Sequence, residues 1–250
     1  MDSVWEWFAW IYKEYGYNFS VFYDSYDRSL FWRGLVTTVY LSSICIFFSV
    51  LLGLIGAWLQ GARSRVIRWV VYWYIQFFRN TPPLIQLYFF YFALGNLLPR
   101  VPNEQGLLAP PLSNFAWAAI SFSFFAAAFN IEIFRAGIEA VPQSIVEAAE
   151  SLGYTRLQSY LTIILPLAFR ISLPALNNNL VNLVKTTTLA YGIAVPELMY
   201  VSAQIWSDQA NVKEMMNLLL LLYIVLVGLL IKGMDKLEDH LRIPGYNIGV

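Results

Sequence analysis

Three polar side chains interrupt a long apolar stretch in the second half of the chain. Asn178, Asn182 and Lys185 are four and then three residues apart, a spacing that places them along one face of a helix. Thr186 extends this polar face and Asn179 flanks it. Amide groups and one cation could bind a polar solute weakly and release it, so these residues are candidates for lining a path. The alternative is hydrogen bonding between helices, which asparagines supply readily in membranes.

A second polar cluster, Arg79-Asn80-Thr81-Pro82, breaks another apolar stretch. A broken helix exposes backbone groups that must line a cavity or be buried in protein, so Arg79, Asn80 and Thr81 are also candidates for the path. Arg79 could attract an anionic group of a solute, neutralise Glu132 or bond freed carbonyls. Gln86, further along the same stretch, is a candidate of the same type.

Glu132 is the only acidic residue that lies clearly within a predicted membrane span, and Arg135 follows it three residues later. The two can pair on one helix face, which predicts a structural ion pair, with a gate as the alternative. No catalytic constellation includes the single histidine, His240. The single cysteine, Cys45, lies in an apolar run, which favours a small buried hydrophobe over a disulfide or a metal ligand.

The segment Ser144–Gly153 favours a short helix between two apolar stretches. Four consecutive residues in its middle have high helix propensity, namely Glu147, Ala148, Ala149 and Glu150. Gly153 falls where a left-handed residue would end the helix. The small alanines leave room for another protein surface, and the flanking carboxylates can pair with basic groups on it.

The composition places these groups in an unusually apolar chain of 250 residues. Hydrophobic residues make up 58% and charged residues 13%, whereas an ordinary soluble domain carries about 25% charged residues. With 16 Lys+Arg and 16 Asp+Glu, the chain has too few charges for a soluble surface and no basic patch for nucleic acid. The composition therefore predicts a protein of the lipid bilayer.

Five segments are long and apolar enough to cross a bilayer as helices, namely Gly34–Leu59, Trp69–Leu94, Phe115–Phe134, Leu161–Val184 and Met215–Ile231. The predicted class is an all-α membrane protein with five transmembrane helices. Around the five-span domain, residues 30–235, we expect an external aromatic-rich interfacial segment at 1–29 and a cytoplasmic tail at 236–250. The proline-rich stretch Gly95–Ser113 is expected to form neither regular helix nor strand.

Lysines and arginines beside the spans set the orientation, because cytoplasmic loops carry an excess of them. Eight of them fall on one side, namely Arg63, Arg65, Arg68, Arg135, Arg156, Lys232, Lys236 and Arg242. That side is predicted to be cytoplasmic. With five spans, the N-terminus then lies outside and the C-terminus inside.

Ordered motifs in the chain carry a resemblance to a known family. Glu147-Ala148-Ala149, Gly153 and Leu165-Pro166 together resemble the coupling motif of ATP-binding-cassette (ABC) importer permeases. Further segments are similar to the polar amino-acid branch of that family, the histidine, glutamate and glutamine type, namely Gly34–Ser42, Arg79–Gln86, Asn182–Leu189 and the tail Lys236–Gly245.

The resemblance implies a type I permease fold in the bacterial cytoplasmic (inner) membrane, and import of polar L-amino acids by alternating access. It also implies several partners: two ATP-binding subunits, a second permease subunit that is the same chain or a homologue, and an extracytoplasmic substrate-binding protein. The chain has no phosphate-binding loop, so the energy must come from another subunit. It also shows no catalytic or metal-ligand cluster, so we expect it to hold no cofactor or metal and to be non-catalytic. ATP and Mg would be bound by the partner ATPase, reached through Ser144–Gly153.

The positive charges of Arg79 and Lys185 slightly favour acidic or neutral amino acids as substrates. Three other functions stay open. An ion-gradient-driven transporter or channel would need an intramembrane carboxylate, for which only Glu132 is available. A membrane-embedded enzyme lacks a visible catalytic cluster, and an ABC permease for another small solute would share the Glu-Ala-Ala element.

Overall fold

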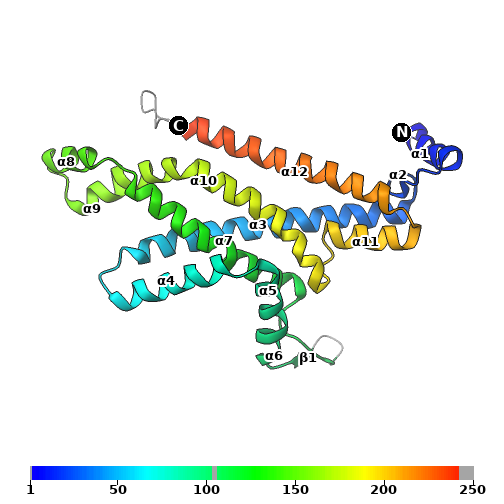
Figure 1. Cartoon of the computed structure of the whole chain (residues 1–250), viewed down its shortest axis with the longest axis horizontal. Helices are drawn as coiled ribbons and strands as arrows, with labels where there is room; N and C mark the ends of the chain where they lie inside the picture. The colour runs from blue at the N-terminus through cyan, green and yellow to red at the C-terminus, as the bar shows by residue number, and fades with distance from the viewer. Residues whose placement is uncertain (1, 103–105, 242–250) are drawn as a thin grey trace. The chain divides into compact units, whose positions relative to one another are not determined.

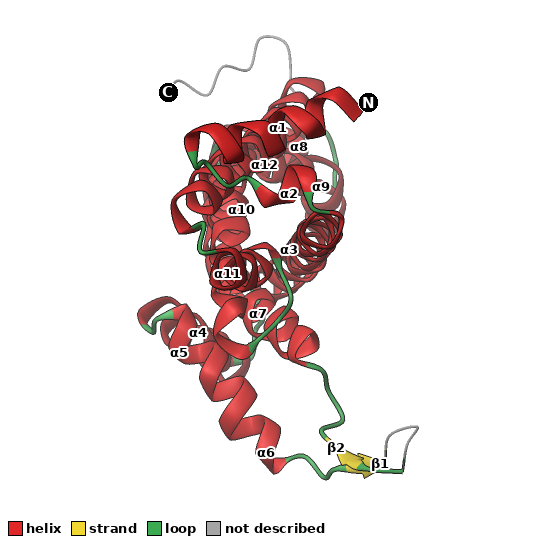
Figure 2. Cartoon of the chain, turned by 90° about the vertical axis from the view of Figure 1, so that its right-hand side faces the viewer, coloured by secondary structure: helices red, strands yellow, loops and turns green. Residues whose placement is uncertain are grey.

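The computed structural model describes residues 2–102 and 106–241, and most of this part is helical (Figures 1 and 2). Four helical stretches in it are long and apolar enough to cross a membrane. They are α3 (Ser25–Gln60), α7 (Asn114–Glu139), the stretch Arg156–Ile193 that contains α10 (Leu165–Thr186), and α12 (Val212–Leu241). The all-helical class is confirmed, and the count of five spans stays a prediction.

The predicted span Trp69–Leu94 is divided into two helices at its proline pair. α4 (Arg65–Asn80) ends at Thr81, whose backbone is extended. α5 (Pro83–Tyr88) then begins and continues into a π-helical segment, Phe89–Leu94. Pro82 disfavours helical conformation at the residue before it, and a proline such as Pro83 suits the first turn of a new helix. The break therefore lies where the sequence predicts it.

The chain forms two compact units, and α3, α7, α10 and α12 each contribute to both. The first unit contains Met1–Cys45, Pro83–Phe122 and Val184–Gly228. The second contains Ile46–Pro82, Ser123–Leu183 and Leu229–Val250. Of the predicted tail, residues 236–241 are helical as the end of α12, and residues 242–250 lie outside the described part.

The first unit begins with two helices, α1 (Asp2–Tyr15) and α2 (Ser20–Tyr23), which pack through stacked rings of Phe8 and Phe22, 4.4 Å between centroids. Asp24 then fixes the start of α3, because its carboxylate accepts hydrogen bonds from the amides of Tyr26 and Asp27, 2.8 and 3.0 Å away. α3 therefore starts at Ser25, ahead of the predicted span.

A buried apolar cluster joins α3, α11 (Leu198–Gln209) and α12 within the first unit. It contains Val21, Phe31, Leu198, Ile205, Met215 and Leu219. A 3₁₀ segment, Thr187–Ile193, leads from α10 toward α11. The buried Asn211 amide donates to the carbonyl oxygen of Asn18 at 2.9 Å, which ties the chain before α2 to the turn before α12.

The stretch Gly95–Ser113 contains regular structure, and the expectation of none was wrong. α6 (Gly95–Leu97) is followed by β1 (Val101–Pro102) and β2 (Leu108–Ala109). The strands are antiparallel, with Val101 opposite Ala109. Both strands of a two-stranded ladder are edges, and an edge strand tolerates a proline because its amide need not donate.

The second unit contains α4, α8 (Gln143–Ser151), α9 (Arg156–Ser159), the π-helical segment Tyr160–Ile164 and parts of α3, α7, α10 and α12. Glycines bring its helices close together. A Cβ atom at Gly56 of α3 would clash with Ile131 of α7, and one at Gly137 of α7 would lie 2.6 Å from the Ala168 carbonyl oxygen of α10.

Candidate functional site

α8 has one face buried against its own unit and another face uncovered. Ala149 is 2% exposed, and Ile145 packs on a cluster that includes Val141, Leu167 and Ala168. The opposite face is exposed and carries Glu147, Ala148 and Glu150, with Leu152, 78% exposed, directly after the helix. α8 is therefore anchored to α7 and α10 while presenting two carboxylates outward.

The end of α8 has the geometry that the sequence predicts. Gly153 is left-handed, with φ of 84°, and its amide donates to the carbonyl oxygen of Glu150 at 3.0 Å. The Tyr154 amide donates to the carbonyl oxygen of Ala149 at 3.1 Å. These bonds satisfy carbonyls that a helix end leaves open.

α9 and the start of α10 complete the connection from α7, with α8 and α9 forming the turn between the long helices (Figure 1). A capping box between Thr155 and Gln158 fixes the N-terminus of α9. α9 continues without a gap through the π-helical segment Tyr160–Ile164 into α10, of which Leu165 and Pro166 are the first two residues. Pro166 has no amide hydrogen to donate to the preceding turn. Leu165 and Pro166 therefore lie where the π-helical segment changes to α-helix.

An ion-pair chain joins α4 to α7. Arg79 pairs with Glu132 at 3.2 Å, Glu132 pairs with Arg135 at 3.3 Å, and Arg135 pairs with Glu139 at 2.9 Å. The Gln60 side chain also donates to Glu132, at 3.4 Å. The predicted Glu132–Arg135 pair is present, and Arg79 neutralises Glu132, one of the three roles considered for it.

The other candidates around the break in the second predicted span lie in separate places. Asn80 donates from its amide to the Gln76 carbonyl oxygen at 2.8 Å, and the Thr81 hydroxyl donates to that of Phe77 at 2.7 Å. Both side chains therefore satisfy carbonyls at the end of α4. Gln86 is buried in α5 and belongs to the first unit.

Neighbouring asparagines of α10 have different environments. Asn179 faces α7, where its amide donates to the Asn130 side-chain oxygen at 2.8 Å and to the Ala126 carbonyl oxygen at 3.2 Å. Asn178 and Asn182 are exposed and one turn apart. Asn179 therefore makes interhelical hydrogen bonds, the alternative considered for the polar stripe.

The exposed face of α10 also includes Pro174 and Lys185, while Thr186 is half-buried. Pro174 lies four residues before Asn178 on the same face, and sequence reasoning missed it although a proline in an apolar stretch is a visible signal. Because proline has no amide hydrogen, the carbonyl of Arg170 lacks its usual helical donor. The face therefore combines side-chain amides, a cation and a backbone acceptor.

Glu197 is a buried acid that sequence reasoning also missed. It is 0% exposed, and its carboxylate accepts hydrogen bonds from the amides of Met199 and Tyr200 at 2.9 and 2.8 Å, which caps α11. Burial raises the pKa of Glu197 to about 7, although these two hydrogen bonds act to lower it. An acid that follows a proline and precedes an apolar run is a helix-start signal that could have found it, because Asp and Glu are favoured near helix N-termini.

Comparison with known proteins matches residues 49–242 to the family described as binding-protein-dependent transport system inner membrane component. The probable glutamine ABC transporter permease protein GlnM of Bacillus subtilis (strain 168) is 32% identical over 225 residues, covering 90% of this chain and 98% of that protein. The glutamate/aspartate import permease protein GltJ of Escherichia coli (strain K12) is 26% identical, covering 87% and 89%.

Solved structures agree with these relatives. A chain from the crystal structure of an amino acid ABC transporter with histidines has a TM-score of 0.74 and 28% identity, covering 85% of this chain and 94% of that one. A chain of the inward-facing MetNI methionine ABC transporter has a TM-score of 0.69 at 19% identity, covering 88% and 100%, and supports the fold alone. The chain therefore belongs to the family of binding-protein-dependent transport system inner membrane components, the membrane-embedded permeases of ABC importers.

Proposed function

We propose that this chain is the permease subunit of an importer that moves polar L-amino acids across the bacterial cytoplasmic membrane by alternating access, driven by ATP hydrolysis in partner subunits. The similarity to GlnM and GltJ supports the substrate class. Because Arg79 is already paired with Glu132, the slight preference for acidic or neutral amino acids rests on Lys185.

The uncovered face of α8 is the observation that carries this proposal. The chain has no phosphate-binding loop, so the energy must enter from another protein. Glu147 and Glu150 can pair with basic groups of an ATPase subunit, which would also hold ATP and Mg. Since Ile145 and Ala149 anchor α8 to its unit, a displacement of α8 would be transmitted to α7 and α10 as a rigid-body motion.

The exposed polar face of α10 is our candidate for the translocation path. A polar helix face in a bilayer is costly unless it lines a water-filled cavity or meets another protein. Asn178, Asn182 and Lys185 could line such a cavity, with a second permease subunit, identical or homologous, completing its wall. We assign the Glu132–Arg135 pair the structural role of holding α4 on α7 through Arg79.

The proposed orientation follows from α8. Its side is cytoplasmic, facing two ATPase subunits, and the C-terminus lies on that side. The N-terminus and its aromatic helix α1 then lie outside, where an extracytoplasmic binding protein would deliver the substrate.

The test is ATP-dependent amino-acid uptake by the complete transporter reconstituted in proteoliposomes with its ATPase and binding protein. Glu147→Arg should abolish uptake or release the ATPase, and Gly153→Val should do the same because a β-branched residue is strained at φ of 84°. Asp239→Arg, at an exposed acid of α12, is the matched control and should transport normally. Normal uptake in both α8 variants, or uptake driven by an ion gradient without ATP, would refute the proposal.

A further inference from the structure

Two adjoining cavities in the second unit form a further site, which Leu165 and Pro166 help to line but no residue of α8 and none of Asn178, Asn182 and Lys185. One has a volume of about 550 Å³ and includes charged residues among its lining, and we call it the polar part; the other has a volume of about 600 Å³ and is lined by apolar and aromatic residues. They share the lining residues Ala57, Trp58, Ile138 and Tyr160. We refer to the two together as the composite cavity.

The apolar part of the composite cavity is lined by aliphatic and aromatic side chains and by no charged residue. Its walls come from α3, α7 and the stretch from α9 to α10, and include Leu54, Phe134, Leu161 and Phe169. Leu54 and Leu161 are exposed, so the slot is open at its edge. A flexible hydrocarbon chain is the kind of group that gains from such a surface.

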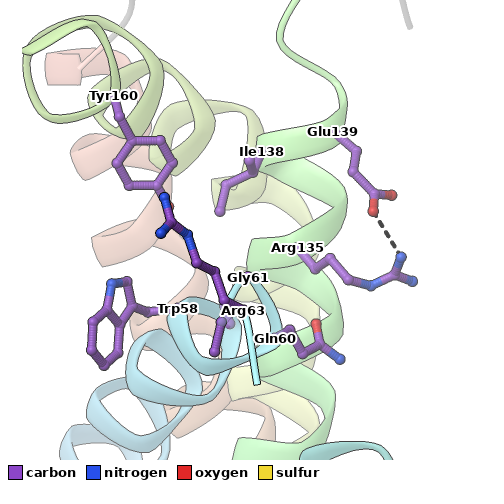
Figure 3. Close-up of a pocket in the computed structure, with 10 residues that line it drawn as sticks. Trp58, Gln60, Gly61, Arg63, Arg135, Ile138, Glu139 and Tyr160 are labelled. Atoms are coloured by element: carbon purple, nitrogen blue, oxygen red, sulfur yellow. Dashed lines mark hydrogen bonds and ion pairs between the residues drawn. The ribbon is translucent and has the colours of Figure 1, made fainter. Parts of the chain in front are cut away.

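The polar part carries three charged side chains, Arg63, Arg135 and Glu139. Arg135 is held by Glu139 at 2.9 Å and also by Glu132. Figure 3 shows Arg135 turned toward Glu139, whereas the Arg63 side chain extends toward Tyr160. Among residues 2–102 and 106–241, Arg63 has no ion-pair partner. One positive charge in the polar part is therefore left without a counter-ion.

The backbone that carries Arg63 is fixed in place. The guanidinium of Arg68 donates to the carbonyl oxygens of Ala62 and Arg63 at 2.6 and 3.2 Å. The Gly61 amide donates to the carbonyl oxygen of Trp58 at 3.1 Å. These bonds close the turn between α3 and α4 and fix the backbone position from which the Arg63 side chain reaches the cavity.

We propose that the composite cavity binds a glycerophospholipid with an anionic headgroup. The single net negative charge of such a headgroup matches the single uncompensated charge of Arg63, and guanidinium groups bind phosphate oxygens through paired hydrogen bonds. One acyl chain occupies the apolar slot. Trp58 and Tyr160, which line both parts, lie between headgroup and chain, the position that such rings favour in membranes. This site is independent of the proposed path.

The test uses the full-length permease in its assembled transporter, stripped of lipid in mild detergent. Phosphatidylglycerol and phosphatidylcholine with identical acyl chains are titrated separately, and native mass spectrometry counts the bound lipid. We expect wild type to prefer phosphatidylglycerol by roughly fivefold or more, because both headgroups offer Arg63 the same phosphodiester oxygens but the choline ammonium adds a positive charge close to the guanidinium. Arg63→Gln should remove this preference, and Arg63→Lys should restore part of it.

Arg65→Gln is the matched control. Arg65 lies two residues after Arg63, its side chain is exposed and it lines neither cavity, so the variant removes the same charge from outside the site. It should keep the preference. Equal binding of the two lipids by wild type, or equal loss in both Arg→Gln variants, would overturn the proposal. Tight binding of the free headgroup glycerophosphoglycerol would also overturn the proposal, because it would show that the ligand is a soluble anion and not a lipid. Lipid binding to the lone chain but not to the assembly would also overturn the proposal, because a partner subunit would then cover the site.

Discussion

Asn178 and Asn179 are adjacent in α10, yet we expect alanine substitutions at the two positions to have different effects, one on transport and the other on folding. Asn179 bonds to Asn130 and Ala126 across the α7–α10 contact, so Asn179→Ala should weaken folding. Asn178 is exposed and belongs to the proposed path. Asn178→Ala should therefore reduce transport and leave folding nearly unchanged.

The cost of Asn179→Ala can be worked out from its contacts. Two interhelical hydrogen bonds are lost, at about 0.6 kcal/mol each in a membrane. The Asn130 side-chain oxygen, in a residue that is 0% exposed, also loses the amide that bonded it, which adds about 1 kcal/mol. The sum is about 2 kcal/mol, or a fall of roughly 4–8 °C in Tm for a chain of this size. Asn178→Ala loses no such contact and should stay within about 0.5 kcal/mol.

Both variants should be measured in the same reconstituted transporter. Thermal unfolding in lipid nanodiscs gives Tm, and initial uptake at limiting substrate, normalised to assembled complex, gives transport. The reasoning would be refuted if Asn178→Ala lowered Tm as much as Asn179→Ala, or if Asn178→Ala transported at the wild-type rate. The first result would place Asn178 in a helix contact, and the second would remove it from the path.

Three further predictions concern stability. Gly137→Ala should lower the free energy of unfolding by about 1–3 kcal/mol through overpacking, because the added Cβ would meet the backbone of α10. Gly233→Ala, at a position that faces open space, should not lower it. Thermal unfolding of the two variants tests this difference. Glu132→Gln should lower Tm more than Arg79→Gln, since it leaves two arginines without their shared acid, and equal shifts would contradict this. The folded-state pKa of Glu197, raised from 4.5 to about 7, should make stability fall by up to about 3 kcal/mol as pH rises from about 4.5 to 7 and stay level above. Glu197→Gln should flatten this dependence in unfolding curves at pH 5, 6 and 8.

Features set by local sequence could be predicted well. The end of α8 at Gly153 follows from a single glycine that accepts a left-handed backbone. The break between α4 and α5 follows from two prolines. Such signals depend only on residues a few positions apart, so no knowledge of the packing is needed to read them.

Features set by contacts between distant residues could not be predicted uniquely. Periodicity placed Asn178 and Asn182 on one face, yet which asparagine meets α7 depends on how α10 is rotated against it. Arg79 had three possible roles, and its partner lies 53 residues away in sequence. The short strands β1 and β2 were missed because only their pairing with each other stabilises them.

The few charges of this chain fall into two groups with different consequences. Those of the α4–α7 contact are paired with one another and so hold helices together, as Glu132 does with two arginines. Others, such as Arg63 and Glu147, have no ion pair within the described residues. An unpaired charge alone does not identify a site, since Arg65 is unpaired there too. Arg63 differs because it lines a cavity with an apolar extension, and Glu147 differs because it stands on a helix whose other face is anchored. The surroundings of each charge, and not its presence, therefore decide which ligand or partner it can bind.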